Sequence, residues 1–167
     1  MTASSPLPGA AQPLETVGAT AANTAARVLI VAVTNATAET LLAAVRARAA
    51  AGPARFQLLL PDPAGHAELT RARRLESRAH GESILADALP LLSEAAGNDV
   101  EGFVSNRHDP MDAIEDTLSS AHVDEIILAT VHHHLAEGLH VDLPRRVAHL
   151  GLPVTTVTAA EQVAAVV

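Results

Sequence analysis

The 167-residue sequence predicts an α/β fold: a three-layer sandwich in which helices cover both faces of a five-stranded parallel sheet. Three observations support this class. Short apolar segments alternate along the chain with segments of helical periodicity. The first apolar segments show no polar alternation, which is typical of strands buried on both faces. Connections of helical length between them favour right-handed crossovers, and therefore parallel strands.

The first predicted strands and the helix between them have clear signals. Residues 27–34 (RVLIVAVT) form a nearly continuous run of branched apolar side chains, and residues 55–63 (RFQLLLPDP) form another that two prolines end. Residues 35–50 between them carry one apolar helical face. Thr37 is the N-cap that we expect for this helix, since its hydroxyl can accept a hydrogen bond from the first turn.

The next segment allows two interpretations. Residues 64–81 are polar and basic, and they suit either a loop or the first part of a long helix, although Gly81 interrupts both patterns. Residues 82–97 then resume a helical apolar period. Pro90 within that period predicts a kink or a restart of the helix.

The second half of the chain continues the alternation. Asp109, followed by Pro110, is the expected cap of the clearest helix in the sequence, and Asp142 is the expected cap of a shorter one. The predicted order is strand, helix, strand, helix and strand over residues 99–106, 109–122, 123–130, 142–151 and 152–158. Such a sheet places its ligands at the carboxyl ends of its strands.

Composition excludes several classes of protein. The net charge of −8 disfavours a general role in binding nucleic acid or an anionic membrane. The absence of cysteine excludes disulfides, thiolate metal sites and cysteine nucleophiles. No apolar run is long enough to span a bilayer, and the first 26 residues lack the features of a signal peptide. We therefore expect a cytoplasmic protein with a disordered tail over 1–26, one domain over 27–158 and a short tail over 159–167.

Several charged residues have simple structural interpretations. Asp62 lies in a Pro-Asp-Pro turn, although a carboxylate there could also face a ligand. Asp124 and Glu125 precede a strand and are expected in a solvated turn. The local basic concentration is expected to be a solvated helix face, with an anionic partner as the alternative. It consists of Arg71, Arg73, Arg74 and Arg78.

Three stretches of the sequence resemble the universal stress proteins. Residues 27–45 are similar to the first strand and helix of that family, residues 106–130 to its Gly-Asp-Pro helix and following strand, and residues 145–157 to its last helix and strand. The resemblance implies an adenine nucleotide alpha hydrolase-like sheet of order 3-2-1-4-5. It also implies dimerisation through the last strand in many members, and ATP binding in some.

The glycine-rich signature of the ATP-binding members is missing after the fourth strand. Ala129 and His132 occupy its first two glycine positions, and neither 140–141 nor 142–143, the alternative places for its Gly-Ser pair, contains glycine or serine. Without glycines, backbone N–H groups cannot approach phosphates closely. Thr34 stands where the family has an aspartate at the end of strand one. The resemblance implies an altered cleft lined by Thr34, Asn35, Leu60, Pro61, Ala129, Thr130, His132, His140 and Val141.

The histidines of the segment ATVHHHLAEGLHVDLPRR (129–146) leave three interpretations open. The first is a solvated loop over the altered cleft. The second is an anion pocket that forms when the imidazoles are protonated, at or below their usual pKa of about 6.5. The third is a metal site built from His132, His134 and His140, since imidazole nitrogens are common zinc and nickel ligands.

Two classes of function follow from these observations. We favour a non-enzymatic binding or regulatory protein of the universal stress type, with a small-molecule ligand for which ATP and AMP are candidates. The alternatives are a metal-dependent module that uses the histidine cluster, and an ATP-binding protein with an atypical phosphate loop. The edge strand 153–157 exposes unpaired backbone groups, so it is expected to pair with a second copy in a homodimer.

Overall fold

The computed structural model describes residues 25–33, 35–63, 70–131 and 142–159. The elements alternate along the chain, and all neighbouring strands are parallel in the order β3-β2-β1-β4-β5, which confirms the predicted fold class. Their bounds are β1 (Ala26–Ala32), α1 (Glu39–Ala51), β2 (Ala54–Leu60), α2 (Arg71–Ala96), β3 (Glu101–Val104), α3 (Pro110–Ser120), β4 (Glu125–Val131), α4 (Leu143–Ala148) and β5 (Val154–Ala159).

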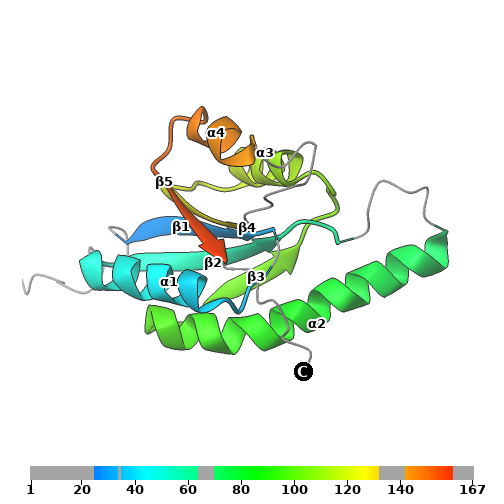
Figure 1. Ribbon diagram of the computed structural model, residues 1–167, viewed down its shortest axis with the longest axis horizontal. Helices are drawn as coiled ribbons and strands as arrows, with labels where there is room; N and C mark the ends of the chain where they lie inside the picture. Colours follow the sequence, from blue (N-terminus) through cyan, green and yellow to red (C-terminus); the bar gives the residue numbers. More distant parts are fainter. Residues whose placement is uncertain (1–24, 34, 64–69, 132–141, 160–167) are drawn as a thin grey trace, which may run out of the picture.

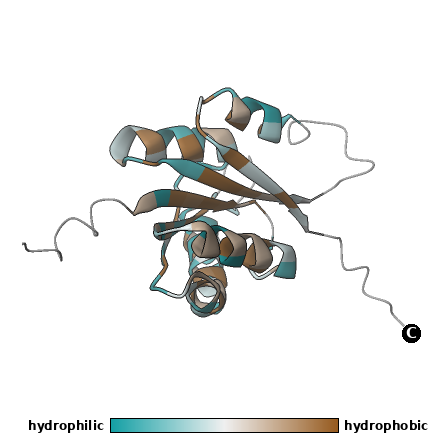
Figure 2. Cartoon of the chain, turned by 90° about the vertical axis from the view of Figure 1, so that its left-hand side faces the viewer, coloured by the Kyte–Doolittle hydropathy of each residue, from teal (hydrophilic) through white to brown (hydrophobic). Residues whose placement is uncertain are grey.

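Helices α1 and α2 cover one face of the sheet, and α3 and α4 cover the other (Figure 1). Successive side chains of β1 point to opposite faces, so Ile30 packs with α1 and α2, whereas Leu29 and Val31 pack with α3 and α4. Figure 2 shows the strands as largely hydrophobic ribbons between the two helical layers. The two cores therefore hold the strand ends in fixed positions.

Helix α2 settles the ambiguity for the part of the basic segment from Arg71 onward, whereas residues 64–69 lie outside the described residues. It is one helix from Arg71 to Ala96, with Pro90 inside it, so the proline does not mark a restart. The Thr70 side chain accepts a hydrogen bond from the Arg73 N–H at the start, and Gly97, with φ +72°, ends the helix in the left-handed conformation. The predicted interruption at Gly81 is wrong, because this glycine is a buried residue of the helix.

The start of α1 differs from the prediction. The N-cap is Ala38, which makes no side-chain cap, and not Thr37. Thr37 instead donates both its N–H and its hydroxyl to Asn35 Oδ1, at 3.0 and 2.8 Å. An asparagine that accepts from the backbone two residues later stabilises a tight turn, so the helix begins only after this turn.

The caps of the later helices follow the sequence more closely. Asp109 Oδ1 accepts hydrogen bonds from the N–H groups of Met111 and Asp112, at 2.7 and 3.4 Å, which confirms the predicted cap of α3. Asp142 is the N-cap residue of α4, but its side chain makes no capping hydrogen bond.

The prediction of a solvated turn before β4 holds for Asp124, which lies in a bend with a partly exposed side chain, but it is wrong for Glu125. Glu125 is the first residue of β4 and is ion-paired with Arg48 of α1, while Asp124 accepts a hydrogen bond from the Arg27 N–H. Both carboxylates therefore join separate elements at the amino edge of the sheet.

The described segments do not cover the whole chain. The predicted N-terminal tail, apart from Ala25 and Ala26, and the predicted C-terminal tail, apart from Ala159, lie outside the described residues. Within the described ranges, no helix combines the length and the apolar character needed to cross a bilayer.

Candidate functional site

The carboxyl ends of β1 and β2 open into a pocket of about 310 Å³. Its walls come from these two strand ends, from the middle of α2 and from the start of α3. Val33, Leu60, Pro61 and Ile84 supply apolar surface, and Asp62, His80 and His108 supply polar groups. Parallel α/β sheets bind ligands outside the carboxyl ends of their strands, and this volume is at the lower end of the usual range for small-molecule pockets.

Helix α2 forms one wall of this pocket, and at Gly81 it also lies very close to β3. Gly81 permits the approach, because a Cβ atom at this position would lie 2.8 Å from Cγ2 of Val104. A larger residue would force either the Val104 side chain or the helix to shift. The glycine in the helix therefore serves packing beside the pocket.

Hydrogen bonds at Asp62 hold three segments together at the pocket rim. The Asp62 N–H donates to the Arg107 carbonyl at 2.9 Å, and the Asp62 carbonyl lies 3.1 Å from Nδ1 of His108. Oδ1 of Asp62 accepts a hydrogen bond from the hydroxyl of Ser77 on α2, at 2.8 Å. The segments after β2 and β3 are thus joined to each other and to α2.

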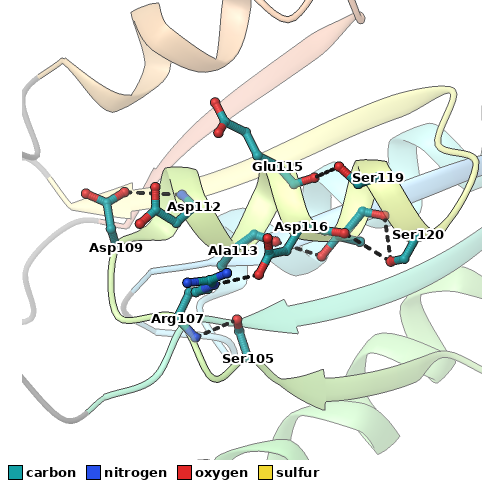
Figure 3. A network of polar contacts seen from close by, with 10 residues as sticks. Ser105, Arg107, Asp109, Asp112, Ala113, Glu115, Asp116, Ser119 and Ser120 are labelled. Atoms are coloured by element: carbon teal, nitrogen blue, oxygen red, sulfur yellow. Dashed lines mark hydrogen bonds and ion pairs between the residues drawn. The ribbon is translucent and has the colours of Figure 1, made fainter.

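A polar network orders the turn between β3 and α3 (Figure 3). Arg107 donates its N–H to Ser105 Oγ at 2.9 Å, and its Nε lies 2.6 Å from Oδ2 of Asp116 on α3. The hydrogen bond that Arg107 donates to the negatively charged carboxylate of Asp116 raises the pKa of Arg107 above its usual value. These contacts, with the Asp109 cap, set the position of His108 at the pocket.

Comparison with solved structures gives the fold a name. A universal stress protein from Archaeoglobus fulgidus matches 78% of this chain and 92% of its own length, with a TM-score of 0.57 and 15% identity. A protein of that family from Burkholderia pseudomallei matches 79% of this chain and 95% of its own, with a TM-score of 0.55 and 18% identity. The chain has the fold of the universal stress proteins. No protein-family model and no curated protein matches it.

Two of the matching universal stress protein structures contain nucleotides. The Archaeoglobus fulgidus protein in complex with dAMP has a TM-score of 0.51 and 16% identity, and the match covers 79% of this chain and 96% of that one. A universal stress protein in complex with cAMP has a TM-score of 0.52 and 18% identity, over 81% of this chain and 99% of that one.

Of the residues predicted to line the cleft, the structure places only some at this pocket. Leu60 and Pro61 line the pocket. Asn35, Ala129 and Thr130 do not: Asn35 is engaged in the turn before α1, and Ala129 is buried in β4, where its carbonyl accepts the Val33 N–H at 3.1 Å. The remaining candidates lie outside the described residues, and they are Thr34, His132, His134, His140 and Val141.

Sequence reasoning missed the contributions of α2 and α3 to the pocket. His80, Gly81 and Ile84 line it from α2, and His108 lines it from the segment before α3. The available signal was Gly81, because a glycine inside a helical pattern indicates close packing. No group of three or more possible metal ligands occurs within the part of the chain that the structure describes, and the three predicted metal-binding histidines fall outside that part.

Proposed function

We propose that this chain is a non-enzymatic binding protein of the universal stress type, and that its carboxyl-edge pocket takes the nucleoside part of an adenine nucleotide. One observation carries the proposal. The pocket lies at the ends of β1 and β2, the working edge of a parallel α/β sheet, in a fold shared with proteins that bind dAMP and cAMP. A regulatory role would then depend on whether a nucleotide occupies this pocket.

The lining of the pocket suits a nucleoside. The apolar side chains of Val33, Leu60 and Ile84 offer surface to the flat faces of a purine. Asp62 supports the sugar, because carboxylates accept hydrogen bonds from hydroxyl groups such as those of ribose. His80 adds ring nitrogens for a polar edge of the base.

The cleft is proposed to be altered on its phosphate side. Ala129 and His132 replace the glycines that would let a loop after β4 wrap around phosphates. Backbone N–H groups of this loop therefore contribute little binding free energy to each phosphate of the ligand. We propose a nucleoside or a nucleoside monophosphate, rather than ATP, as the preferred ligand.

The reactive side chains in the described lining of the pocket are a carboxylate and two imidazoles, those of Asp62, His80 and His108. Its described lining contains no serine, threonine or tyrosine hydroxyl, and the chain has neither cysteine nor lysine. The usual side-chain nucleophiles for acyl or phosphoryl transfer, apart from carboxylate and imidazole, are therefore missing from the described lining.

We further propose that two copies pair through residues 153–157. β5 lies at one edge of the sheet, where Thr155 and Thr156 are exposed and Val154 and Val157 are half-buried. Pairing would satisfy the free backbone groups of this edge and bury the two valines further.

Titration calorimetry with adenosine, AMP, dAMP, cAMP and ATP tests the proposal. The informative variant is His80→Trp, which adds a large side chain at the pocket mouth, and the matched control is Ala79→Trp, which adds the same group at an exposed neighbouring position outside the lining. We expect adenosine and AMP to bind, the His80→Trp variant to bind at least about tenfold more weakly, and the control to bind like wild type.

Two outcomes would overturn the proposal. One is no heat of binding with any of the five ligands. The other is binding that both tryptophan variants leave unchanged, since the ligand would then occupy another part of the molecule. Chromatography of AMP and ATP after long incubation with the protein completes the test, because conversion of either nucleotide would reject a purely binding role.

A further inference from the structure

A second pocket, of about 210 Å³, lies at the amino ends of β1 and β2, at the opposite edge of the sheet from the carboxyl-edge pocket. Leu29 and Gln57 of these strands line this amino-edge pocket, and so do residues 121–123, which follow α3. Its volume is below the usual range for pockets that bind organic ligands. The amino-edge pocket therefore suits a small ion.

Two arginines lie side by side at the amino-edge pocket. Arg27 of β1 and Arg55 of β2 both line it, and they are Cα partners in the parallel register of the two strands. Partners in neighbouring strands lie about 4.8 Å apart, with their side chains on the same face of the sheet. Leu29, two residues after Arg27, packs in the core with α3 and α4, so both arginines belong to that face.

Neither guanidinium group has a hydrogen-bond or ion-pair partner among the residues that the structure describes. Arg27 contacts Asp124 only through its backbone, and both arginines are exposed. Like charges directly opposite one another on neighbouring strands destabilise a sheet. An oxyanion between the two side chains would remove this repulsion and accept hydrogen bonds from both guanidinium groups.

Glu101 of β3 also lines the amino-edge pocket and limits which oxyanion can bind there. It is the Cα partner of Gln57, two residues after Arg55, so it lies diagonally across from that arginine. An ionised carboxylate can only accept hydrogen bonds. It therefore repels sulfate, which has no proton at neutral pH, but it can accept a hydrogen bond from the O–H that inorganic phosphate retains.

Asp124 fixes the segment after α3 beside the arginines. Its Oδ2 accepts the Arg27 N–H at 2.8 Å, and its Oδ1 lies 2.9 Å from Nε2 of His122, which lines the amino-edge pocket. Asp124 itself is not among the lining residues. These two contacts join residues 121–123 to β1, so this wall of the pocket is in place before a ligand binds.

We propose that Arg27 and Arg55 bind inorganic phosphate in the amino-edge pocket, with Glu101 accepting a hydrogen bond from the protonated phosphate oxygen. The site goes beyond the proposed function, because it lies at the other edge of the sheet and requires no nucleotide. The protein then has two separate binding sites, one at each edge of its sheet.

Calorimetry with inorganic phosphate, sulfate and methyl phosphate at about pH 7.5 tests the choice of ion. We expect wild type to bind phosphate with a dissociation constant on the order of 1 mM, as for a few hydrogen bonds between charged groups. Sulfate should bind about fivefold more weakly, the factor for a like-charge contact of about 4 Å in water. Methyl phosphate should resemble sulfate, because a phosphate monoester has mostly lost its last proton at this pH.

The variant Arg27→Gln/Arg55→Gln tests the two arginines and keeps the backbone N–H that Asp124 accepts. It should bind phosphate at least about tenfold more weakly. Without phosphate and at low salt, its Tm should exceed that of wild type, because the repulsion between the arginines is removed. The matched control, Arg71→Gln/Arg74→Gln, removes the same charge from the exposed start of α2 and should bind phosphate like wild type.

Two further variants test the acceptor and the location. Glu101→Gln replaces the carboxylate by an amide that can also donate, so phosphate and sulfate should bind about equally. His80→Trp fills the mouth of the carboxyl-edge pocket and should leave the phosphate dissociation constant unchanged. Circular dichroism checks that each variant is folded.

Several results would overturn the proposal. One is no binding of phosphate by wild type, and another is an equal loss in the Arg71→Gln/Arg74→Gln control, because the effect would then be one of overall charge. Loss of phosphate binding in His80→Trp would place the ion at the carboxyl-edge pocket instead. A preference for phosphate over sulfate that persists in Glu101→Gln would reject the role of this carboxylate.

Discussion

Arg48 and Glu125 form a two-point ion pair between the last turn of α1 and the first residue of β4. Nε of Arg48 lies 2.6 Å from Oε2 of Glu125, and Nη2 lies 2.8 Å from Oε1. A third donor, Nη1, reaches the Gly52 carbonyl at 3.3 Å. The hydrogen bond to Glu125 raises the pKa of Arg48, and burial opposes this rise. The pair thus joins the end of α1, the turn after it and a central strand.

Loss of this pair should weaken the fold measurably. Its side chains are only 21% and 28% exposed, so Arg48→Ala leaves a partly buried carboxylate without its partner. We expect a loss of about 1–2 kcal/mol in the free energy of unfolding, between the values for exposed and fully buried pairs. Urea denaturation measures it. The control is Arg46→Ala, which breaks the exposed Arg46–Glu39 pair, and an equal loss in the two variants would contradict this account.

The carboxylate of Asp124 should make stability depend on pH in the acid range. Its pKa is lowered mainly by the 2.8 Å hydrogen bond from the Arg27 N–H and further by His122, while burial opposes the shift. Because the folded-state pKa is below the unfolded value of about 3.9, the stabilisation is present above that pH and is lost as pH falls through the folded-state pKa.

Thermal unfolding of wild type and Asp124→Asn between pH 2 and pH 7 tests this dependence. The wild-type advantage should be constant near neutral pH and shrink below about pH 4. A stability difference that stays the same down to pH 2 would show that the charge of Asp124 makes no contribution.

The contact between Gly81 and Val104 should reverse the usual effect of a glycine-to-alanine change in a helix. Alanine is favoured over glycine in a helix by about 1 kcal/mol. Here its Cβ would lie 2.8 Å from Cγ2 and 3.0 Å from Cγ1 of the stiff Val104 side chain. We therefore expect Gly81→Ala to destabilise the protein in chemical denaturation.

The same change in a Val104→Ala background provides the control. With both γ-methyl groups removed, Gly81→Ala should stabilise by up to about 1 kcal/mol, as the intrinsic helix preference predicts. If Gly81→Ala has the same effect in both backgrounds, the close packing of α2 on β3 is not what requires this glycine.

The proposed dimer can be disrupted at the outer edge of β5. The Ile126 N–H donates to the Pro153 carbonyl, and residues of a parallel strand alternate in the direction of their hydrogen bonds. The backbone groups of Thr156 therefore point away from β4. Thr156→Pro removes the outward N–H, and we expect a shift from dimer to monomer in light scattering after size-exclusion chromatography. Thr156→Ala keeps the N–H and should remain dimeric; a monomeric wild type would reject the interface.

The sheet could be predicted from the sequence because its signals are local. The apolar run before Thr34 and the run that ends at Pro61 each encode a buried strand through neighbouring residues alone. The alternation with helices then implies parallel strands, and the resemblance to the universal stress proteins implies the order that the structure has.

The pocket and the ion pair could be predicted only in part, because they depend on residues far apart in the chain. Arg48 and Glu125 are separated by 77 positions, and their local sequence fits an exposed pair of charges equally well. Local helix propensity predicts an interruption at Gly81, because the sequence around this glycine does not show that Val104 packs against it. With the helix divided at Gly81, the sequence does not predict that α2 lines the pocket.

A crystal structure of the protein with AMP tests the central claim most directly. We predict the adenine between the ends of β1 and β2, in contact with Leu60 and Ile84. AMP bound at any other place on the protein, or its absence from the carboxyl-edge pocket at concentrations that saturate the protein in solution, would contradict the account.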